Sequence, residues 1–382
     1  MDIITLPEFK GLFRRNLESM STLLRYIRTT QVRVGNKLQP LRAYMKKKSI
    51  PIEDIELLYK HIQSRDEYLT RFYDLSLQIH IDKLRIHGNV KPMKNREMSN
   101  NKNIVYKNFI RNMHMNDILQ NTKSGIENVP TFLDVLDDLY NNLIIDYKLL
   151  TPSARFYVKN GRIGSVFSSY YFRASIMNPY LVYSLNKTVL RGTRIFTPTL
   201  GWSSYCYGFL ECPEVEEYVG TDVIPSVCDK TRDLAKLYSR KPTVNIYCQP
   251  SEDLYKDPQF LKKYKGHFDL VFFSPPYYKL EMYDSENQST TRYADYNDWL
   301  EKYWEQTIRL SSYVLEKGGR LCYILSGYGS PSGSEHYNLL EDMNRITKKY
   351  FILNSTQPMH NKNVHVSTHR DTAERIMIFT KK

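Results

Sequence analysis

Hydrophobic and polar positions follow two different patterns in the two parts of this chain of 382 residues. In the first part, apolar residues recur every three or four positions within Leu12–Ile27, Ile55–Ile62 and Phe132–Ile144. That spacing collects apolar side chains on one face of a helix. We therefore expect helices there, and over residues 5–86 as a whole. Residues 87–104 are polar and basic without a period, which indicates a mobile loop or linker.

From about Arg194 onwards, short apolar runs alternate with stretches that are long enough for helices. Such runs are typical of buried parallel strands, and their alternation with helices predicts an α/β fold with helices on both faces of a sheet. The last two runs are joined by a loop without a helical pattern, so we expect an antiparallel hairpin at the sheet edge. The seven expected strands are Arg194–Thr199, Glu217–Asp222, Thr243–Tyr247, Phe268–Phe273, Gly319–Ser326, Tyr350–Ser355 and Arg375–Thr380.

Positive charge is concentrated in the first part of the chain. The formal net charge is +13, and residues 1–110 hold 21 Lys and Arg against 11 Asp and Glu, or about +10. Such an asymmetry predicts that this part faces a polyanion, with a merely solvated basic surface as the alternative. The candidate phosphate contacts are Arg14, Arg15, Arg25, Arg28, Lys46, Lys47 and Lys48.

Membrane and disulfide chemistry are not expected. No apolar run approaches the length of a membrane span, and the first residues are charged instead of forming an apolar signal core. We therefore expect an intracellular protein. The five cysteines form no C-x-x-C pair, which indicates reduced thiols. Cys248 is expected to be buried.

The most specific local feature is the apolar run Phe268–Phe273 followed by Ser274-Pro275-Pro276-Tyr277. The two prolines end a strand because neither can donate a backbone hydrogen bond, and their fixed φ angles make the turn stiff. The turn would lie at the carboxyl end of a strand, where open α/β sheets bind ligands. Ser274 and Tyr277 would then form a rigid platform for a planar, polar substrate. The alternative is a purely structural Pro-Pro turn.

This tetrapeptide matches the Asp/Asn/Ser-Pro-Pro-Tyr/Phe signature of S-adenosylmethionine-dependent amino-methyltransferases, which methylate the exocyclic nitrogen of adenine or cytosine. Residues 194–382 resemble these class I enzymes, in particular the DNA methylases of large viruses and phages. The resemblance implies a Rossmann-like methyltransferase domain, which we expect over residues 151–382. The helical pattern and the positive charge predict a separate helical, basic domain over residues 1–150. The resemblance rests on Thr197–Ser204, Asp222, Ser251–Asp253, Ser274–Tyr277, Glu281–Tyr283, Gln288-Ser289 and Asp298–Leu300.

The resemblance also implies a site for the methyl donor, S-adenosylmethionine. Gly201 would supply the tight turn after the first strand, Asp222 would accept from the ribose hydroxyls, and Asp253 would accept from the adenine amine. The remaining residues of the implied site are Thr197, Thr199, Trp202 and Phe172. The chain departs from the usual pattern, because Thr197 stands where an acidic residue is common and Ser203-Ser204 where a second glycine is common. An ordinary strand–turn–helix junction, with Asp222 and Asp253 as helix caps, is the alternative.

The expected chemistry depends on Ser274 and Pro275. An exocyclic amine is a poor nucleophile, because its lone pair is delocalised into the ring. The Ser274 hydroxyl and the Pro275 carbonyl would accept its two hydrogens and direct the lone pair towards the sulfonium methyl group. Tyr277 would stack on the base, with Pro276 stiffening the turn. No metal is required, and we interpret His360, His365 and His369 as residues of an exposed loop.

The sequence therefore predicts an S-adenosylmethionine-dependent methyltransferase acting on a nucleobase amine, most favourably in DNA. Cytosine N4 and adenine N6 both remain open, and so does RNA. A catalytically inactive nucleic-acid-binding subunit with the same fold is the main alternative, because the glycine content of the first turn is low. A methyltransferase for small molecules or protein amines is disfavoured by the basic N-terminal part. Oligomeric state is left open.

Overall fold

The computed structural model describes residues 4–13, 22–64, 84–125, 129–238, 242–326, 337–359 and 374–382. The chain forms two compact units. The larger unit consists of residues 80–114 and 175–382, and the smaller unit consists of residues 2–79 and 115–174. This division differs from the expected boundary at residue 150, because residues 84–114 pack against α10 (Pro179–Leu185) and α11 (Ser204–Leu210) of the larger unit.

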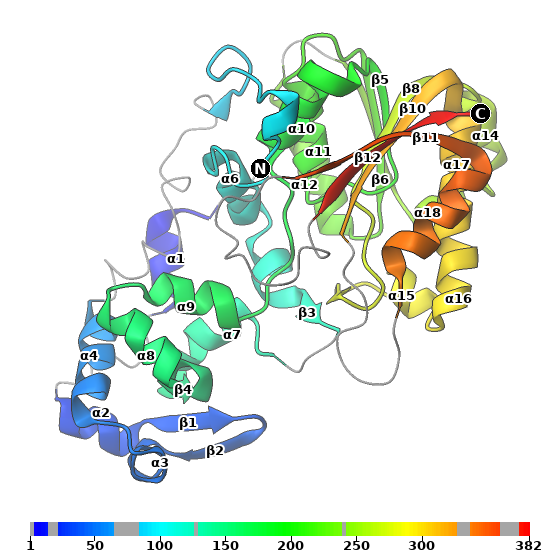
Figure 1. The fold of residues 1–382 in the computed structure, drawn as a ribbon. Helices are drawn as coiled ribbons and strands as arrows, with labels where there is room; N and C mark the ends of the chain where they lie inside the picture. The colour runs from blue at the N-terminus through cyan, green and yellow to red at the C-terminus, as the bar shows by residue number, and fades with distance from the viewer. Residues whose placement is uncertain are drawn as a thin grey trace. The chain divides into compact units, whose positions relative to one another are not determined.

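A seven-stranded sheet forms the centre of the larger unit (Figure 1). Its strands appear in the order β11-β12-β10-β8-β5-β6-β7. They are β5 (Arg194–Thr197), β6 (Glu217–Asp222), β7 (Thr243–Cys248), β8 (Phe268–Phe273), β10 (Leu315–Leu325), β11 (Phe351–Pro358) and β12 (Arg375–Lys381). Each of the seven expected strands is therefore present, with bounds that differ from the expected ones by a few residues at most.

The strand directions confirm the predicted fold class. Strands β7, β6, β5, β8 and β10 run parallel to one another, whereas β12 is antiparallel to both β10 and β11. A parallel sheet with a final antiparallel hairpin is the Rossmann-like arrangement expected for a class I methyltransferase domain. The central strand β8 is buried on both faces, with five of its six residues buried, whereas the edge strands β7 and β11 are largely accessible.

Helices cover both faces of the sheet (Figure 1). One layer holds α10 (Pro179–Leu185), α11 (Ser204–Leu210) and α12 (Pro225–Lys236). The other holds α13 (Ser251–Leu254), α14 (Pro258–Tyr264), α17 (Gln306–Val314) and α18 (Leu339–Tyr350). Shorter elements between β8 and α17 are β9 (Glu281–Met282), α15 (Ser289–Arg292) and α16 (Tyr296–Asp298).

The segment before the sheet is packed rather than mobile. Residues 87–104, expected to be a linker, bury Met93 and Met98, and the Asn100 amide donates to the Ile176 carbonyl over 3.0 Å. This expectation is wrong, because apolar side chains within a polar stretch anchor it. Helix α6 (Val105–Met113) then buries Phe109 in the same unit.

The smaller unit contains a short hairpin that the helical prediction for residues 5–86 missed. Strands β1 (Gln31–Val34) and β2 (Lys37–Pro40) pair antiparallel, and β4 (Ile144–Asp146) pairs parallel to β1. The helices of this unit are α1 (Leu6–Leu12), α2 (Leu23–Thr29), α3 (Leu41–Lys48), α4 (Ile52–Gln63), α7 (Phe132–Asp137), α8 (Pro152–Lys159) and α9 (Ile163–Tyr170). Among the described residues of both units, no helix has the length and apolar character needed to cross a bilayer.

Candidate active site

The carboxyl edge of the sheet collects most of the residues singled out from the sequence. Because β5, β6, β7, β8 and β10 run in one direction, the segments that follow them meet at this edge. Strand β12 runs the opposite way, and Arg375 at its start pairs with Leu325 at the end of β10. Glu374 therefore lies at the same edge. The predicted residues there are Thr199, Gly201, Trp202, Asp222, Asp253, Ser274, Pro275, Pro276 and Tyr277.

The turn after β8 presents two oxygen acceptors. Pro275 is buried, whereas Ser274, Pro276 and Tyr277 are partly exposed. The Ser274 hydroxyl donates to the Ile324 carbonyl of β10 over 3.0 Å. Since that bond uses the only hydroxyl proton, the lone pairs of Ser274 Oγ remain able to accept. No described residue donates to the Pro275 carbonyl, which also remains able to accept.

The Tyr277 ring has a defined orientation. Its hydroxyl accepts a hydrogen bond from the Ser326 amide at the end of β10 over 2.7 Å. Burial raises the pKa of Tyr277 above its usual value, so the hydroxyl stays neutral. The ring is thus anchored to the neighbouring strand by its tip and to the stiff turn by its backbone.

Tyr205 connects this turn to the bend after β5. Its hydroxyl accepts a hydrogen bond from the Ser274 amide over 3.0 Å. A Cβ atom built on Gly201 would lie only 2.2 Å from Cζ of the same ring. The ring therefore lies directly on the Gly201 backbone and holds Ser274 with its tip. One buried side chain therefore joins the turn that would hold the donor to the turn that would hold the amine.

The bend itself contains three successive residues in the left-handed region. Their φ angles are +54° at Gly201, +58° at Trp202 and +65° at Ser203. Glycine adopts this conformation without cost, but each of the other two residues costs about 1–2 kcal/mol. The conformation therefore requires compensation from the surrounding structure.

That compensation comes from hydrogen bonds of the two side chains. Trp202 Nε1 donates to the Ser175 carbonyl over 3.1 Å, and the indole makes a T-shaped contact with the Tyr283 ring. Ser203 Oγ lies 2.8 Å from His114 Nε2 and 2.6 Å from Thr231 Oγ1. Burial lowers the pKa of His114 well below its usual value, so the imidazole is neutral in this network.

Asp222, predicted to bind the donor ribose, also holds the bend. Its carboxylate accepts from the backbone amides of Leu200 at 3.1 Å, Val223 at 2.8 Å and Ile224 at 3.2 Å. Burial raises the pKa of Asp222, and these three amides oppose that rise. A carboxylate has about four acceptor sites, so Asp222 keeps capacity for a ligand hydroxyl.

Asp253, predicted to accept from the donor adenine, belongs to an ion-pair network after β7. Arg292 lies 2.6 Å from the Glu252 carboxylate and 2.9 Å from that of Asp253. Burial raises the pKa of Glu252 to about 7, although Arg292 opposes the rise. Asp253 is about one-third exposed and retains an open side.

Two further carboxylates give the edge an acidic character. Glu281 accepts from the Ser175 amide and from the Tyr283 hydroxyl, each over 2.8 Å. Burial raises the pKa of Glu281 and that of Glu374, and the charge of Glu281 raises the pKa of Glu374 further. With Asp222, they form a group of partly exposed acids around Tyr205 and Tyr277. Such a group favours a cationic ligand.

Several predicted residues are placed differently. Thr197 is fully buried, and its hydroxyl lies 2.7 Å from the Tyr218 hydroxyl, so it faces the interior of the unit. Phe172 belongs to the smaller unit, where its backbone pairs with Pro130 and Phe132. Cys248 was expected to be buried but is exposed, because it is the last residue of β7, the outermost strand on one side of the sheet.

Other predictions concern the smaller unit or fall on residues without a description. Arg25, Arg28, Lys46, Lys47 and Lys48 are all exposed in the smaller unit. Arg14, Arg15, His360, His365 and His369 lie outside the described residues. Within the described ranges, no three His, Cys, Asp or Glu side chains are grouped as a metal site would require.

Three residues at the carboxyl edge of the sheet received no role in the sequence analysis. Tyr205 stands one helical turn after Gly201, but nothing local shows that its tip reaches Ser274. Glu281 was noted only as part of the resemblance. Glu374 precedes the last strand and carries no sequence signal, because its place at the edge depends on the antiparallel direction of β12.

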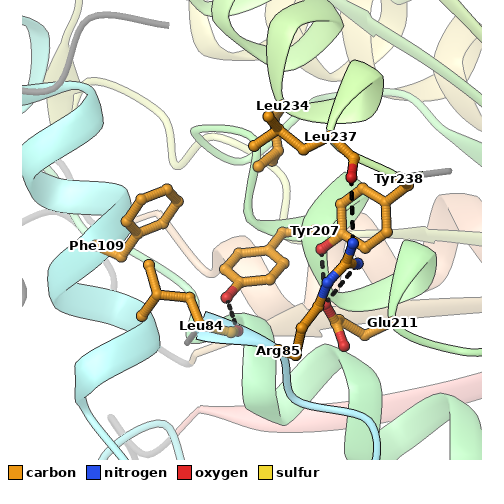
Figure 2. A pocket seen from close by; sticks show the side chains of 8 residues that line it. All are labelled: Leu84, Arg85, Phe109, Tyr207, Glu211, Leu234, Leu237 and Tyr238. Carbon is orange, nitrogen blue, oxygen red and sulfur yellow. Dashed lines mark hydrogen bonds and ion pairs between the residues drawn. The ribbon is translucent and has the colours of Figure 1, made fainter. Parts of the chain in front are cut away.

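A separate small cavity lies at the C-terminal ends of α11 and α12 (Figure 2). It measures about 60 Å³, which is too small for a nucleoside-sized ligand. Glu211 accepts there from the amides of Ile86 and His87, each over 2.8 Å, and from the Tyr238 hydroxyl over 2.8 Å. Arg85 lies over the Tyr238 ring at 4.2 Å. These contacts anchor the segment before α6 and do not suggest catalysis.

No family model and no curated protein matches the chain. Among solved structures, it is similar to the N-methyltransferase NodS of Bradyrhizobium japonicum, in complex with S-adenosyl-l-homocysteine. The identity is 14% over 53% of this chain and 83% of NodS, with a TM-score of 0.35. TrmN of Thermus thermophilus has 14% identity over 54% of this chain and 49% of its own, with a TM-score of 0.36. The [4+2]-cyclase SpnF has 12% identity over 54% and 83%, with a TM-score of 0.37. The strand order, not these likenesses, establishes the fold.

Proposed function

We propose that this protein is an S-adenosylmethionine-dependent methyltransferase acting on the exocyclic amine of a nucleobase, cytosine N4 or adenine N6, most favourably in DNA. The observation that carries the proposal is the turn after β8. Its Ser274 hydroxyl donates into β10, its Pro275 carbonyl has no described donor, and Tyr205 ties it to the Gly201 bend.

The geometry suits transfer to an amine with two hydrogens. When Ser274 Oγ and the Pro275 carbonyl accept those hydrogens, the nitrogen moves towards a tetrahedral geometry and its lone pair becomes available. The nitrogen–carbon bond then forms as the carbon–sulfur bond breaks, and sulfur keeps the bonding pair. The extra proton on nitrogen leaves through one of the two acceptors to water. Positioning and fixed dipoles supply the acceleration.

The bend after β5 suits the donor. S-adenosylmethionine carries a sulfonium and an ammonium cation, and the acidic group of Asp222, Glu281 and Glu374 favours such a ligand. Asp222 would accept from the ribose, and Asp253 would accept from the adenine amine on its open side. The chain's own contribution is to hold the donor beside Ser274 and to keep the bend rigid.

The nucleobase assignment is supported by Tyr277. Tyr277 is partly exposed in the turn that carries the two acceptors, and base–aromatic stacking contributes about 1–3 kcal/mol. A base in a duplex would have to leave the helix to reach Ser274, whereas a single strand would not. DNA is favoured over RNA by the resemblance alone.

Two measurements test the proposal together. Saturating S-adenosylmethionine should raise the melting temperature, since a ligand bound only by the native state stabilises it. Mass spectrometry of nucleosides from DNA and from RNA incubated with protein and donor should then show N4-methylcytosine or N6-methyladenine. A thermal shift with no modified nucleoside in either polymer would refute the nucleobase assignment.

A second function, a non-catalytic nucleic-acid-binding subunit, is favoured by Thr197. An acid is common at that position in the resembling enzymes, but Thr197 is buried against Tyr218 and offers nothing to a donor. Nucleic-acid binding without any thermal shift at saturating donor would support this function and exclude the enzymatic one.

A further inference from the structure

We propose that the segment from α2 to α3 in the smaller unit docks on the phosphate backbone of the nucleic acid. This surface comprises α2, the hairpin β1–β2 and α3, and is called the basic module below. The proposal rests on the proposed function only in taking nucleic acid as the partner. It concerns a surface outside the sheet edge and can be tested without the donor.

The basic module is one packed substructure. Helix α3 contacts α2 and both strands of the hairpin. Tyr26, Val32, Leu41 and Tyr44 are buried within it. Its polar residues therefore project from a defined scaffold, unlike those of an extended basic tail.

Its charge is entirely of one sign. Residues 22–50 contain no Asp or Glu, and their eight cations are Arg25, Arg28, Arg33, Lys37, Arg42, Lys46, Lys47 and Lys48. Arg33 is neutralised by Asp138, with Nη2 and Oδ2 2.6 Å apart. The other seven are exposed, and none makes an ion pair with a described residue.

The spacing of these cations is unfavourable in the absence of an anion. Arg25 and Arg28 are three residues apart on α2, and Arg42 and Lys46 are four apart on α3. Like charges at these spacings share a helix face and repel each other. The lysines at the C-terminal end of α3 interact favourably with the helix dipole, but that effect explains one or two of the charges and not seven.

Helices elsewhere in the chain show the contrasting arrangement. In α12, Arg232 pairs with Asp229 and Lys236 pairs with Asp233. In α18, Arg345 pairs with Asp342, again three residues away. The exposed faces of α12 and α18 therefore mix charges, and the basic module does not. A segment with exposed cations and no acids favours a polyanion, because each phosphate contact releases a condensed counterion.

The decisive experiment compares two triple substitutions with the same change in charge. In the full chain, Lys46→Gln, Lys47→Gln and Lys48→Gln are combined. The control combines Lys262→Gln, Lys263→Gln and Lys265→Gln in the larger unit, where all three lysines are also exposed. Binding of a short fluorescein-labelled DNA duplex is followed by anisotropy, without S-adenosylmethionine, over about 50–200 mM KCl.

The α3 variant should bind about 10-fold or more weakly at low salt, and its plot of log affinity against log salt should be shallower by about 2–3. The control should change the slope by less than about 1. Equal slopes in the two variants would overturn the proposal. A third variant with Arg at the three α3 positions should restore the slope, which a purely structural role would not predict.

Two further readouts distinguish docking on nucleic acid from a structural role of the lysines and from docking on a lipid surface. Melting temperature should stay nearly equal in the α3 variant, because the removed repulsion offsets the lost interaction with the helix dipole; a large fall would indicate a structural role and overturn the proposal. Vesicles of phosphatidylcholine with phosphatidylserine serve as a second polyanion. Binding to vesicles, lost in the α3 variant, together with no DNA binding by the unmodified chain would assign the module to a lipid surface instead. The thermal shift caused by S-adenosylmethionine is expected to be the same in all variants, so failure of docking and failure of the enzymatic proposal give different results.

Discussion

The two turns that follow the neighbouring strands β5 and β8 are both rigid, but for different reasons. After β8, rigidity is local, because Pro275 and Pro276 fix their own φ angles. After β5, Gly201, Trp202 and Ser203 adopt left-handed angles that depend on distant partners. The contrast teaches that a turn can be specified by its own residues or by what packs around it. Only the first kind leaves a strong mark in the sequence.

The largest expected effect concerns the turn after β8. Ser274→Ala removes one acceptor for the amine, and methyl transfer should fall about 100-fold to 1,000-fold. The melting shift caused by S-adenosylmethionine should be nearly unchanged, because the donor would contact the other turn. Ser311→Ala is the control, since Ser311 also donates its hydroxyl to a carbonyl, that of Thr307. Unchanged turnover in Ser274→Ala would remove this residue from the mechanism.

The turn after β5 should respond through stability. Gly201→Ala places a side chain at a φ of +54° and against the Tyr205 ring, and should lower the free energy of unfolding by about 3 kcal/mol. Gly266→Ala is the matched control. Its φ is +57°, but the nearest atom to the new Cβ is 3.9 Å away, so we expect a loss of about 1 kcal/mol. Urea denaturation measures both, and equal losses would show that the Tyr205 contact does not matter.

A third turn, after β7, extends the comparison because an ion pair holds it. The folded pKa of Glu252, about 7, lies above its ordinary value of 4.5. The folded state therefore binds more protons than the unfolded state between these pH values, and the contribution of Glu252 to stability falls as pH rises through that window. Glu252→Gln can keep a hydrogen bond to Arg292 and does not titrate.

The free energy of unfolding of the unmodified chain, relative to Glu252→Gln, should drop on the order of 2 kcal/mol between pH 5 and pH 8. Urea denaturation at several pH values measures this difference. A relative rise over the same window would mean that Arg292 outweighs burial and lowers the folded pKa.

The smallest expected effect separates the two ends of Tyr277. Tyr277→Phe removes the hydrogen bond that the Ser326 amide donates to the Tyr277 hydroxyl and should lower the free energy of unfolding by about 1 kcal/mol. Base binding should hardly change, because the ring remains. Tyr277→Ala should in addition raise KM for the nucleic acid about 10-fold, with the donor-induced melting shift retained. Equal losses of donor and nucleic-acid binding would indicate a folding role instead.

Much of the larger unit could be predicted because its signals are local. A run such as Phe268–Phe273 must be buried on both sides, and that demand alone indicates a central parallel strand. The hairpin at residues 31–40 also had a signal, Gly35-Asn36 between alternating residues, but its strands are only four residues long. Helical spacing on either side outweighed it.

The candidate site was predicted less completely, since its hydrogen bonds join distant segments. Ser274 meets the Ile324 carbonyl 50 residues later, and Tyr205 meets the Ser274 amide 69 residues later. Asp222 and Asp253 were predicted from the resemblance, at positions that follow expected strands. Their partners, the Leu200 amide and Arg292, were not.

The amino-acid sequence by itself determined the positions of the strands and the stiffness of the Pro-Pro turn, because burial and proline geometry act within a few residues. Tertiary structure alone decided that the Ser274 hydroxyl donates its proton to the Ile324 carbonyl and that the Tyr205 ring leaves no room for a side chain at Gly201. It also decided that Glu374 lies at the same edge of the sheet as Asp222. These depend on the order and direction of strands that are far apart in the chain, and no local pattern encodes that order.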